Sequence, residues 1–234
     1  MKYLRTGLTE GTLIYNEYLK EKGLYSKDTE NNFINWLYST SGVYDKSVSG
    51  SYFDFDPDEI RESPVYTTFL KTYTDSLRGA DTLDLMVHDS FWVPPDYINS
   101  FAKLLDPVWE RPFYWLDPAI INSLISDKTV VINDVAPLYK KYDFDHVKSP
   151  TTFFNEGPDD NYFETLSKLI EKAKTKDADT YLISAGAYSV PLADALSDKK
   201  AIVLGSGLQK IFPVTVPDSM KPSNHHKIED SKYW

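Results

Sequence analysis

The chain has 234 residues and no cysteine, and it carries a formal net charge of -10. The missing cysteines exclude thiol nucleophiles, disulfides and cysteine-ligated zinc or iron–sulfur sites, and the negative charge argues against broad electrostatic binding of nucleic acid or anionic membranes. No apolar run approaches the ~18 residues of a membrane span, and the first residues lack the apolar core of a signal peptide. We therefore expect a cytoplasmic protein of one or two domains with no membrane span.

The sequence of the N-terminal half predicts alternating strands and helices. The signals are apolar residues at helical spacing, short apolar runs typical of buried strands, and turn residues between them. The expected elements are a strand over 2–6, a turn at Gly7, a helix over 9–21, a helix from about 30 to 42, a loop over 43–58, a helix from 57 to 77, a strand over 82–87, a helical pattern over 97–105 and a strand over 112–116.

The C-terminal half continues this alternation with stronger signals. The expected elements are a helix over 118–125, a strand over 129–132, a short helix over 137–142, a loop over 143–160, a helix over 163–173, a strand over 180–183, a helix over 191–196 and a strand over 201–204. Such alternation predicts an α/β fold, with a mostly parallel, Rossmann-like sheet and helices on both faces. We expect a single domain over 1–213 and a polar tail over 214–234.

Ligands of open parallel sheets bind beyond the carboxyl ends of the strands, so the residues that follow each predicted strand are the candidate site. Small residues in two of these turns would let backbone N–H groups approach a phosphate, although any tight turn needs them too. The candidate segments are Gly7 to Glu10, His88-Asp89, Asn133-Asp134, Ser184 to Tyr188, and Gly205-Ser206-Gly207.

Three segments carry a resemblance to a known family. Leu4-Arg5-Thr6-Gly7-Leu8-Thr9-Glu10-Gly11 is similar to the Arg-Phe-Gly-Asp-Gly-Glu segment of the GT-D-type glycosyltransferases, and the stretches 179–193 and 200–212 resemble that family's last two strand–turn units. The strand at 129–134 is similar to a middle strand of the group. Within the group, the chain looks most like the glycosyltransferase domains with which large algal viruses decorate their capsid protein, which would place it in the host cytoplasm.

The resemblance implies transfer of a sugar from a nucleotide-sugar donor, a UDP-sugar or even UDP-L-rhamnose, to a hydroxyl of an oligosaccharide or glycoprotein acceptor. The family holds its donor and a Mg²⁺ or Mn²⁺ ion with an Asp-X-Glu pair, but here Leu8 occupies the Asp position and offers no oxygen ligand. Fixed donors would then bind the diphosphate. The expected donor-binding residues are Arg5, Gly7, Glu10, Ser184, Gly186, Ala187, Tyr188 and Gly205.

Two of these residues have a structural interpretation as well. Glu10 is either an acceptor for ribose or sugar hydroxyls or a first-turn carboxylate that stabilises the helix dipole. Tyr188 either stacks on the base or contacts the diphosphate, or it lies in the core.

An inverting transfer needs a base beside the acceptor hydroxyl. Asp89 is the candidate, with His88 second, and both stand at a strand end where they could equally be a cap and a core histidine. Trp92, Asp54 and Asp56 are the candidate acceptor-binding residues.

Two other classes of function stay open. One is a non-catalytic carbohydrate-binding or scaffold domain in which Leu8 marks a lost donor site. The other is a glycoside hydrolase with two carboxylates, such as Asp54 and Asp89. The chain could also be a module of a longer multidomain protein.

Overall fold

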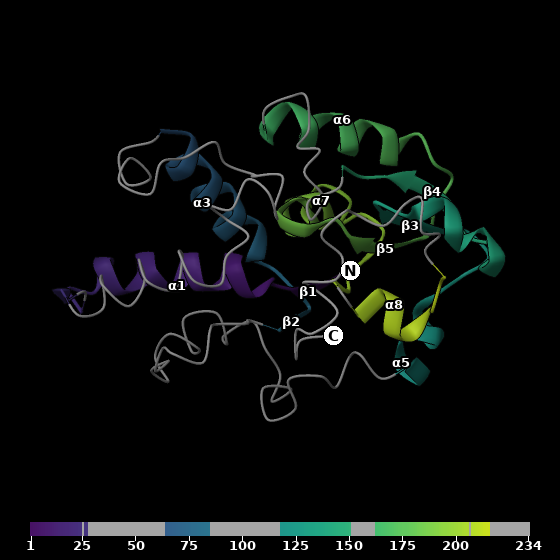
Figure 1. Cartoon of the computed structure of the whole chain (residues 1–234), viewed down its shortest axis with the longest axis horizontal. Helices are drawn as coiled ribbons and strands as arrows, with labels where there is room; N and C mark the ends of the chain where they lie inside the picture. The colour runs from purple at the N-terminus through teal and green to yellow at the C-terminus, as the bar shows by residue number, and fades with distance from the viewer. Residues whose placement is uncertain (25, 28–63, 85–117, 151–161, 206, 216–234) are drawn as a thin grey trace.

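A computed structural model describes residues 1–24, 26–27, 64–84, 118–150, 162–205 and 207–215 of the chain (Figure 1). Its centre is a six-stranded sheet in the order β2-β1-β6-β5-β3-β4, and every described pairing of strands is parallel. The strands are β1 (Lys2–Arg5), β2 (Thr82–Asp84), β3 (Thr129–Asn133), β4 (Asp145–Lys148), β5 (Thr180–Ser184) and β6 (Lys200–Val203). The predicted α/β, Rossmann-like fold class is confirmed.

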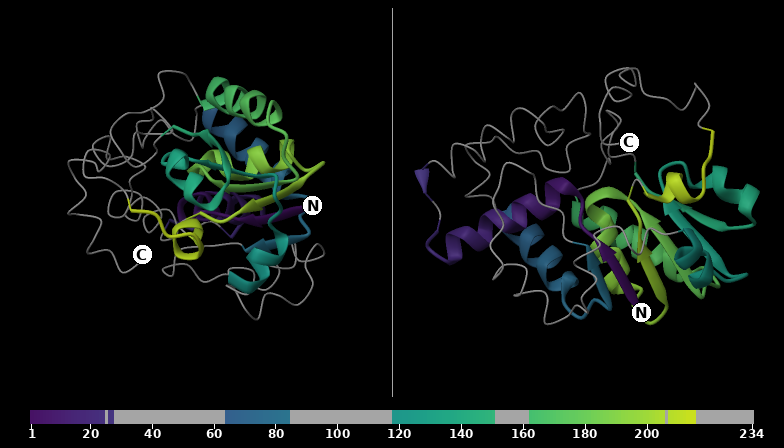
Figure 2. Two further views of the ribbon diagram at one scale, coloured as in Figure 1. Left: turned by 90° about the vertical axis from the view of Figure 1, so that its right-hand side faces the viewer. Right: turned by 90° about the horizontal axis from the view of Figure 1, so that it is seen from below.

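Helices cover both faces of this sheet, as the two views of Figure 2 show. One apolar cluster joins the sheet to α1 (Leu8–Glu21), α3 (Pro64–Leu77), α6 (Tyr162–Lys174) and α7 (Ser189–Ala195), and we call this side the α6 face. A second cluster joins the opposite side to α5 (Pro118–Leu124), the 3₁₀ helix η3 (Ala136–Tyr142) and α8 (Gly207–Ile211), and we call it the α8 face.

The inner residues of the central strands are apolar because both faces of these strands are covered. In β5, Tyr181 and Ile183 belong to the cluster of the α6 face, whereas Leu182 between them belongs to the cluster of the α8 face. This alternation is the two-residue period of a strand. It explains why the apolar runs near 130 and 181 predict strands so clearly.

One predicted element is wrong. Residues 145–148 lie in the expected loop over 143–160, but they form the edge strand β4, paired to β3 alone. Only Val147 of its four residues is buried, and Asp145 and Lys148 are exposed. An edge strand with charged, exposed positions shows no apolar run, so composition did not reveal it. The predicted elements at 30–42, 97–105 and 112–116 lie outside the described residues, as do residues 85–87 of the strand expected over 82–87 and residues 216–234 of the expected tail.

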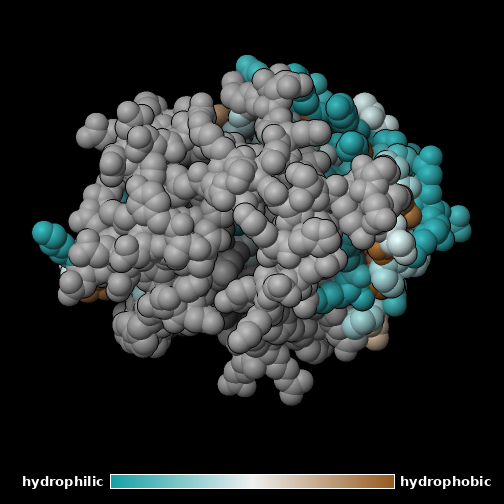
Figure 3. All heavy atoms as spheres, viewed as in Figure 1, coloured by the Kyte–Doolittle hydropathy of each residue, from teal (hydrophilic) through white to brown (hydrophobic). Residues whose placement is uncertain are grey.

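The described part of the surface in Figure 3 is mainly hydrophilic along the rim formed by α6 and β4. Exposed residues of α6 on this rim include Glu164, Lys168, Glu171 and Lys172. The inner side of the same helix is apolar, with Leu166, Leu169 and Ala173 in the core. This helix is therefore amphipathic, as its predicted face indicates.

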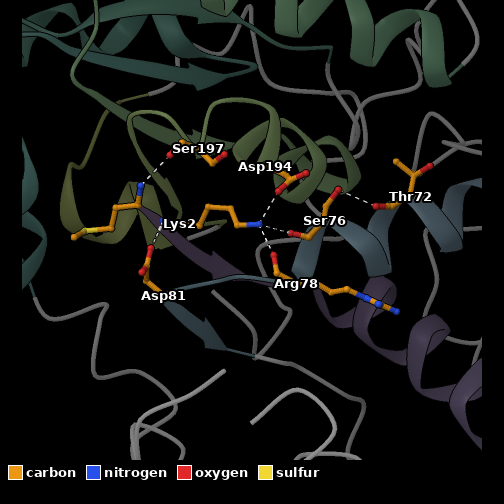
Figure 4. A network of polar contacts seen from close by, with 8 residues as sticks. Lys2, Thr72, Ser76, Arg78, Asp81, Asp194 and Ser197 are labelled. Atoms are coloured by element: carbon orange, nitrogen blue, oxygen red, sulfur yellow. Dashed lines mark hydrogen bonds and ion pairs between the residues drawn. The ribbon is translucent and has the colours of Figure 1, made fainter. Parts of the chain in front are cut away.

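Polar groups at the amino ends of the strands are bonded to one another (Figure 4). The buried ammonium of Lys2 donates to Asp194 Oδ1 at 2.6 Å and to the carbonyl oxygens of Ser76 at 3.1 Å and Arg78 at 2.6 Å. The Lys2 backbone N–H donates to Asp81 Oδ2 at 2.7 Å. This network ties β1 to the C-terminal end of α3 and to α7.

Candidate functional site at the carboxyl edge of the sheet

Four of the predicted site segments meet at one edge of the sheet. Arg5 ends β1, Ser184 ends β5, Asn133 ends β3, and Gly205 follows β6 by two residues. Because β1, β6, β5 and β3 are neighbours in that order and all run in parallel, their carboxyl ends form a single row. The turns after β1 and β5 are separated by one strand, or about 10 Å.

Beyond this row, the chain leaves neighbouring strands toward opposite faces. It enters α1 on the α6 face after β1, but α8 on the α8 face after β6. After β5 it passes to α7 on the α6 face, and after β3 it passes to η3 on the α8 face. Ligands of open parallel sheets bind where adjacent strands send their connections apart in this way.

The turn between β1 and α1 places Arg5 beside the end of β6. Its guanidinium is partly exposed, and Nη1 donates a long hydrogen bond of 3.5 Å to the Leu204 carbonyl. Gly7 is the N-cap of α1, with extended backbone angles, and its carbonyl accepts from the Gly11 N–H at 2.9 Å. A cation therefore lies at the junction of β1 and β6.

Glu10 is turned inward at the start of α1. Glu10 as a whole is 6% exposed, and its carboxylate occupies the space that a Cβ on Gly7 would need. Burial raises the pKa of the Glu10 carboxyl, and a bond from its own backbone N–H acts in the opposite direction. Glu10 therefore lies in the first turn of α1 with a buried side chain whose ionised form is disfavoured.

The turn after β5 contains both partly exposed and fully buried residues. Ser184 and Gly186 are partly exposed, and Gly186 has a φ of 55°, which favours glycine. Ala187 and Tyr188 are fully buried. The Tyr188 ring stacks on Tyr162 with centroids 4.8 Å apart, and burial raises its pKa to about 12. For Tyr188 the core interpretation is the one observed, so its ring cannot stack on a nucleotide base without leaving the core.

Two backbone N–H groups in the same turn already donate hydrogen bonds within the protein. The Tyr188 N–H donates to the Ala185 carbonyl at 3.2 Å, and the Ala185 N–H donates to Ser189 Oγ at 2.8 Å. Gly205 also has a left-handed φ of 52°, and its carbonyl accepts from the Leu208 N–H at 3.1 Å. The small residues thus make both turns tight, with Gly186 and Gly205 partly exposed at the row.

Asn133 and Asp134 form the end of β3, which the sequence includes among the candidate segments without giving either residue a role. The Asn133 side chain donates from Nδ2 to the Ser184 carbonyl at 2.9 Å, which ties β3 to β5. The Val135 N–H donates to Asn133 Oδ1 at 3.0 Å and to Asp134 Oδ1 at 2.9 Å. Burial raises the pKa of Asp134, and its bond from Val135 and nearby Lys148 lower it. A desolvated, oriented carboxylate therefore stands at the row.

The other predicted residues cannot be placed. His88, Asp89, Trp92, Asp54 and Asp56 lie outside the described residues, and Leu8 is described only as the first residue of α1. Within the described ranges, no group of three or more His, Asp or Glu side chains could hold a metal ion, and no helix has the length and apolar character to cross a membrane.

The Asp-X-Glu metal site of the GT-D-type glycosyltransferases does not fit the turn after β1. Leu8 supplies no oxygen, and the Glu10 carboxylate is buried against Gly7. Comparison with known proteins found no match to any family model, curated protein or solved structure.

Proposed function

We propose that this protein is a glycosyltransferase that takes a sugar from a nucleotide-sugar donor, with UDP-sugars as the first candidates, and transfers it to a hydroxyl of a glycan or glycoprotein. The observation that supports this proposal is the row of turns at the carboxyl edge. In this row Arg5 ends β1, Gly205 follows β6 and Gly186 follows β5, and these three strands are neighbours. The class of reaction comes from the sequence resemblance, and in this proposal the donor binds along the row.

In this proposal the diphosphate of the donor lies at the junction of β1 and β6. Arg5 provides a guanidinium with five donors in a planar fork, which matches a phosphate better than a point charge does. The remainder of the chain is strongly acidic, so a local cation is needed to hold a dianionic ligand. Since the turn does not fit a metal site, Arg5 and backbone N–H groups stabilise the departing diphosphate.

Deprotonation of the acceptor hydroxyl is assigned to Asp89, with His88 as the second candidate, and acceptor binding to Trp92, Asp54 and Asp56. These assignments rest on the sequence alone. The Asp89 carboxylate would accept the hydroxyl proton as the acceptor oxygen attacks the anomeric carbon and the nucleoside diphosphate departs, which inverts the anomeric centre. Asp89→Asn should then lose glycan transfer but keep slow donor hydrolysis, and unchanged transfer would reject the assignment.

A non-catalytic carbohydrate-binding domain is the second candidate function. The observation that favours it is the same turn, where Leu8 and the buried Glu10 leave neither carboxylate of the family pair accessible. Such a domain would bind glycans but no nucleotide sugar, and this difference separates the two candidates.

Ligand-dependent thermal stability tests the proposal directly. The whole chain would be heated with UDP, GDP, ADP and their sugar conjugates, with Mn²⁺ or with EDTA. A ligand at ~100 times its Kd adds about 2.7 kcal/mol of stability, which moves the melting temperature by several degrees. We expect one nucleotide series to stabilise the protein equally in EDTA. Stabilisation by oligosaccharides alone would support the binding domain instead.

An Arg5→Met variant locates the site. It should lose most of the nucleotide-dependent shift, because the phosphate loses its charge-assisted donors. Arg78→Met is the matched control, since the Arg78 side chain is 73% exposed at the end of α3 and bonds only weakly to Asp75. An unaltered shift in Arg5→Met would show that the nucleotide binds elsewhere.

A further inference from the structure

The carboxylate of Asp134, at the end of β3, is one for which the sequence predicts no role. Asp134 is partly exposed and follows directly after the buried strand β3. Its Oδ1 accepts from the Val135 N–H at 2.9 Å, and the Asn133 amide also contacts it. The Asn133 side chain also donates to the Ser184 carbonyl on β5, so the residue that contacts Asp134 is bonded to a second strand. A carboxylate held in this way keeps one orientation.

Two hydroxyls close to this position are buried without a hydrogen-bond partner in the described part of the chain. They belong to Tyr139 on η3 and to Ser149, whose N–H donates to the Asn133 carbonyl at 3.0 Å. Tyr139 lies on η3, which packs against β3, and Asp134 directly follows β3. The charge of Asp134 adds to burial in raising the pKa of Tyr139. Buried hydroxyls are normally satisfied, so an unpartnered hydroxyl beside the end of β3 is unusual for ordinary core.

The position of Asp134 along the row sets the size of the ligand that could join it to Arg5. From β1 to β3 the sheet has three strand-to-strand steps, through β6 and β5. At ~4.8 Å per step, the two side chains originate about 14 Å apart. A single phosphate or a monosaccharide cannot span this distance, whereas an extended nucleoside diphosphate with its sugar can reach both ends.

We propose that Asp134 accepts hydrogen bonds from the ribose hydroxyls of a nucleoside diphosphate whose phosphates bind at Arg5. This inference rests on the proposed function and specifies which part of the donor lies over which strand. The base and ribose lie over β5 and β3, and the diphosphate lies over β6 and β1. The sugar to be transferred then extends past β1, on the β2 side of the sheet.

The chemistry of a vicinal diol suits this carboxylate. An ionised carboxylate has about four acceptor sites, and the internal bond from Val135 to Oδ1 leaves Oδ2 and part of Oδ1 for the two ribose O–H donors. Bonds to a charged acceptor are roughly twice as strong as neutral ones. Glu10, the carboxylate at the start of α1, is by contrast buried against Gly7.

The test compares a nucleotide with its analogue that lacks the diol. Binding of UDP, or of whichever of UDP, GDP and ADP binds best, is measured by calorimetry against its 2′,3′-dideoxy form, with the whole chain. The wild type should prefer the ribose form by about 10- to 100-fold, as expected for lost bonds to a charged acceptor. Asp134→Asn should bind the ribose form more weakly and the dideoxy form almost unchanged, so the preference collapses.

Two variants make the result specific. Asp179→Asn changes an exposed carboxylate just before β5, at the opposite edge of the sheet, and should keep the full preference. Arg5→Met should weaken both ligands equally. Retention of the ribose preference by Asp134→Asn overturns this inference and leaves the proposed function standing. Failure of the wild type to bind any nucleoside diphosphate overturns both, and urea unfolding of Asp134→Asn confirms that it is folded.

Discussion

The two edges of the sheet treat their polar groups in opposite ways. At the amino edge, the buried ammonium of Lys2 has three oxygen partners, and the neighbouring Asp81 carboxylate accepts a backbone N–H. At the carboxyl edge, the Tyr139 and Ser149 hydroxyls are buried without partners in the described residues, and Asp134 is desolvated. The Lys2 network is fully bonded, although the Ser126 Oγ near the amino end of β3 also lacks a partner in the described residues. At the carboxyl edge the unpartnered hydroxyls cost stability, and in the proposed function this edge is the one that binds a ligand.

If the proposed function is correct, groups important for stability and groups important for binding lie at opposite edges of the sheet. Fully bonded buried polar networks rigidify a protein, whereas an unsatisfied buried group costs stability and needs an explanation. Substitutions at the amino edge should therefore affect unfolding and leave binding intact, and substitutions of ligand-facing groups at the carboxyl edge should do the reverse. We expect the largest of these effects at Lys2.

Lys2→Met keeps the apolar stem of the side chain and removes its ammonium. Two carbonyl oxygens near the end of α3 and the Asp194 carboxylate then lose their donor. Asp194 is 45% exposed, so solvent compensates part of its loss and the carbonyls account for most of the effect. We expect the free energy of unfolding in urea to fall by about 2–3 kcal/mol, with nucleotide affinity of the folded protein unchanged.

Lys71→Met is the control for that experiment. Lys71 also pairs with an aspartate, but its side chain is 77% exposed, so its removal should leave the urea midpoint nearly where it was. Equal destabilisation by the two variants would show that the bonds of Lys2 contribute no more to the free energy of unfolding than an exposed ion pair does.

The next effect is a pH dependence that arises from Glu10. Its folded pKa is raised by burial above the ordinary value of 4.5. Below that value, both the folded and the unfolded chain bind the proton, and Glu10 has no influence on stability. As the pH rises above it, the unfolded chain loses the proton first, so the folded state is destabilised by up to about 1.4 kcal/mol per pH unit until the folded pKa is reached.

Glu10→Gln removes this titration. The free energy of unfolding of the variant, minus that of the wild type, should increase as the pH is raised from about 4 to 7. Glu21→Gln, a change of an exposed carboxylate on the same helix, serves as the control. A difference that stays constant with pH would mean that the Glu10 carboxyl is solvated, and its interpretation as a ligand acceptor would regain support.

The sequence predicts most of the sheet because five strands carry a local signal. Apolar runs near 130, 181 and 202 are buried on both faces, the run that begins at 82 gives β2, and the strand at 2–5 precedes a glycine turn. The edge strand β4 is missed because only Val147 of its residues is buried, so its pairing to β3 is a tertiary property.

Site prediction divides in the same way. The turns at Gly186 and Gly205 are recognised from residue type, because their left-handed φ favours glycine. Gly7 also marks a turn, although its own φ is one that any residue adopts. Whether Glu10 or Tyr188 points inward is set by helix and core packing, which the residues alone leave open. Asp134 enters the proposed site because of the strand order, which places β3 three strands from β1 although 123 residues separate Lys2–Arg5 from Thr129–Asn133 in the chain.

The smallest predicted effect tests how the turn after β1 is packed. Gly7 has a φ of -68°, which alanine also adopts, so the backbone gives no reason for glycine. A Cβ there would instead collide with Oε2 of Glu10 and lie 3.0 Å from its Cδ. Gly7→Ala should therefore cost about 1 kcal/mol through displacement of the Glu10 side chain. In a Glu10→Ala background the same change should cost almost nothing, because the obstructing carboxylate is gone. Urea unfolding of the four proteins measures this coupling, and additive effects would mean that Gly7 is required for a reason other than the inward position of Glu10.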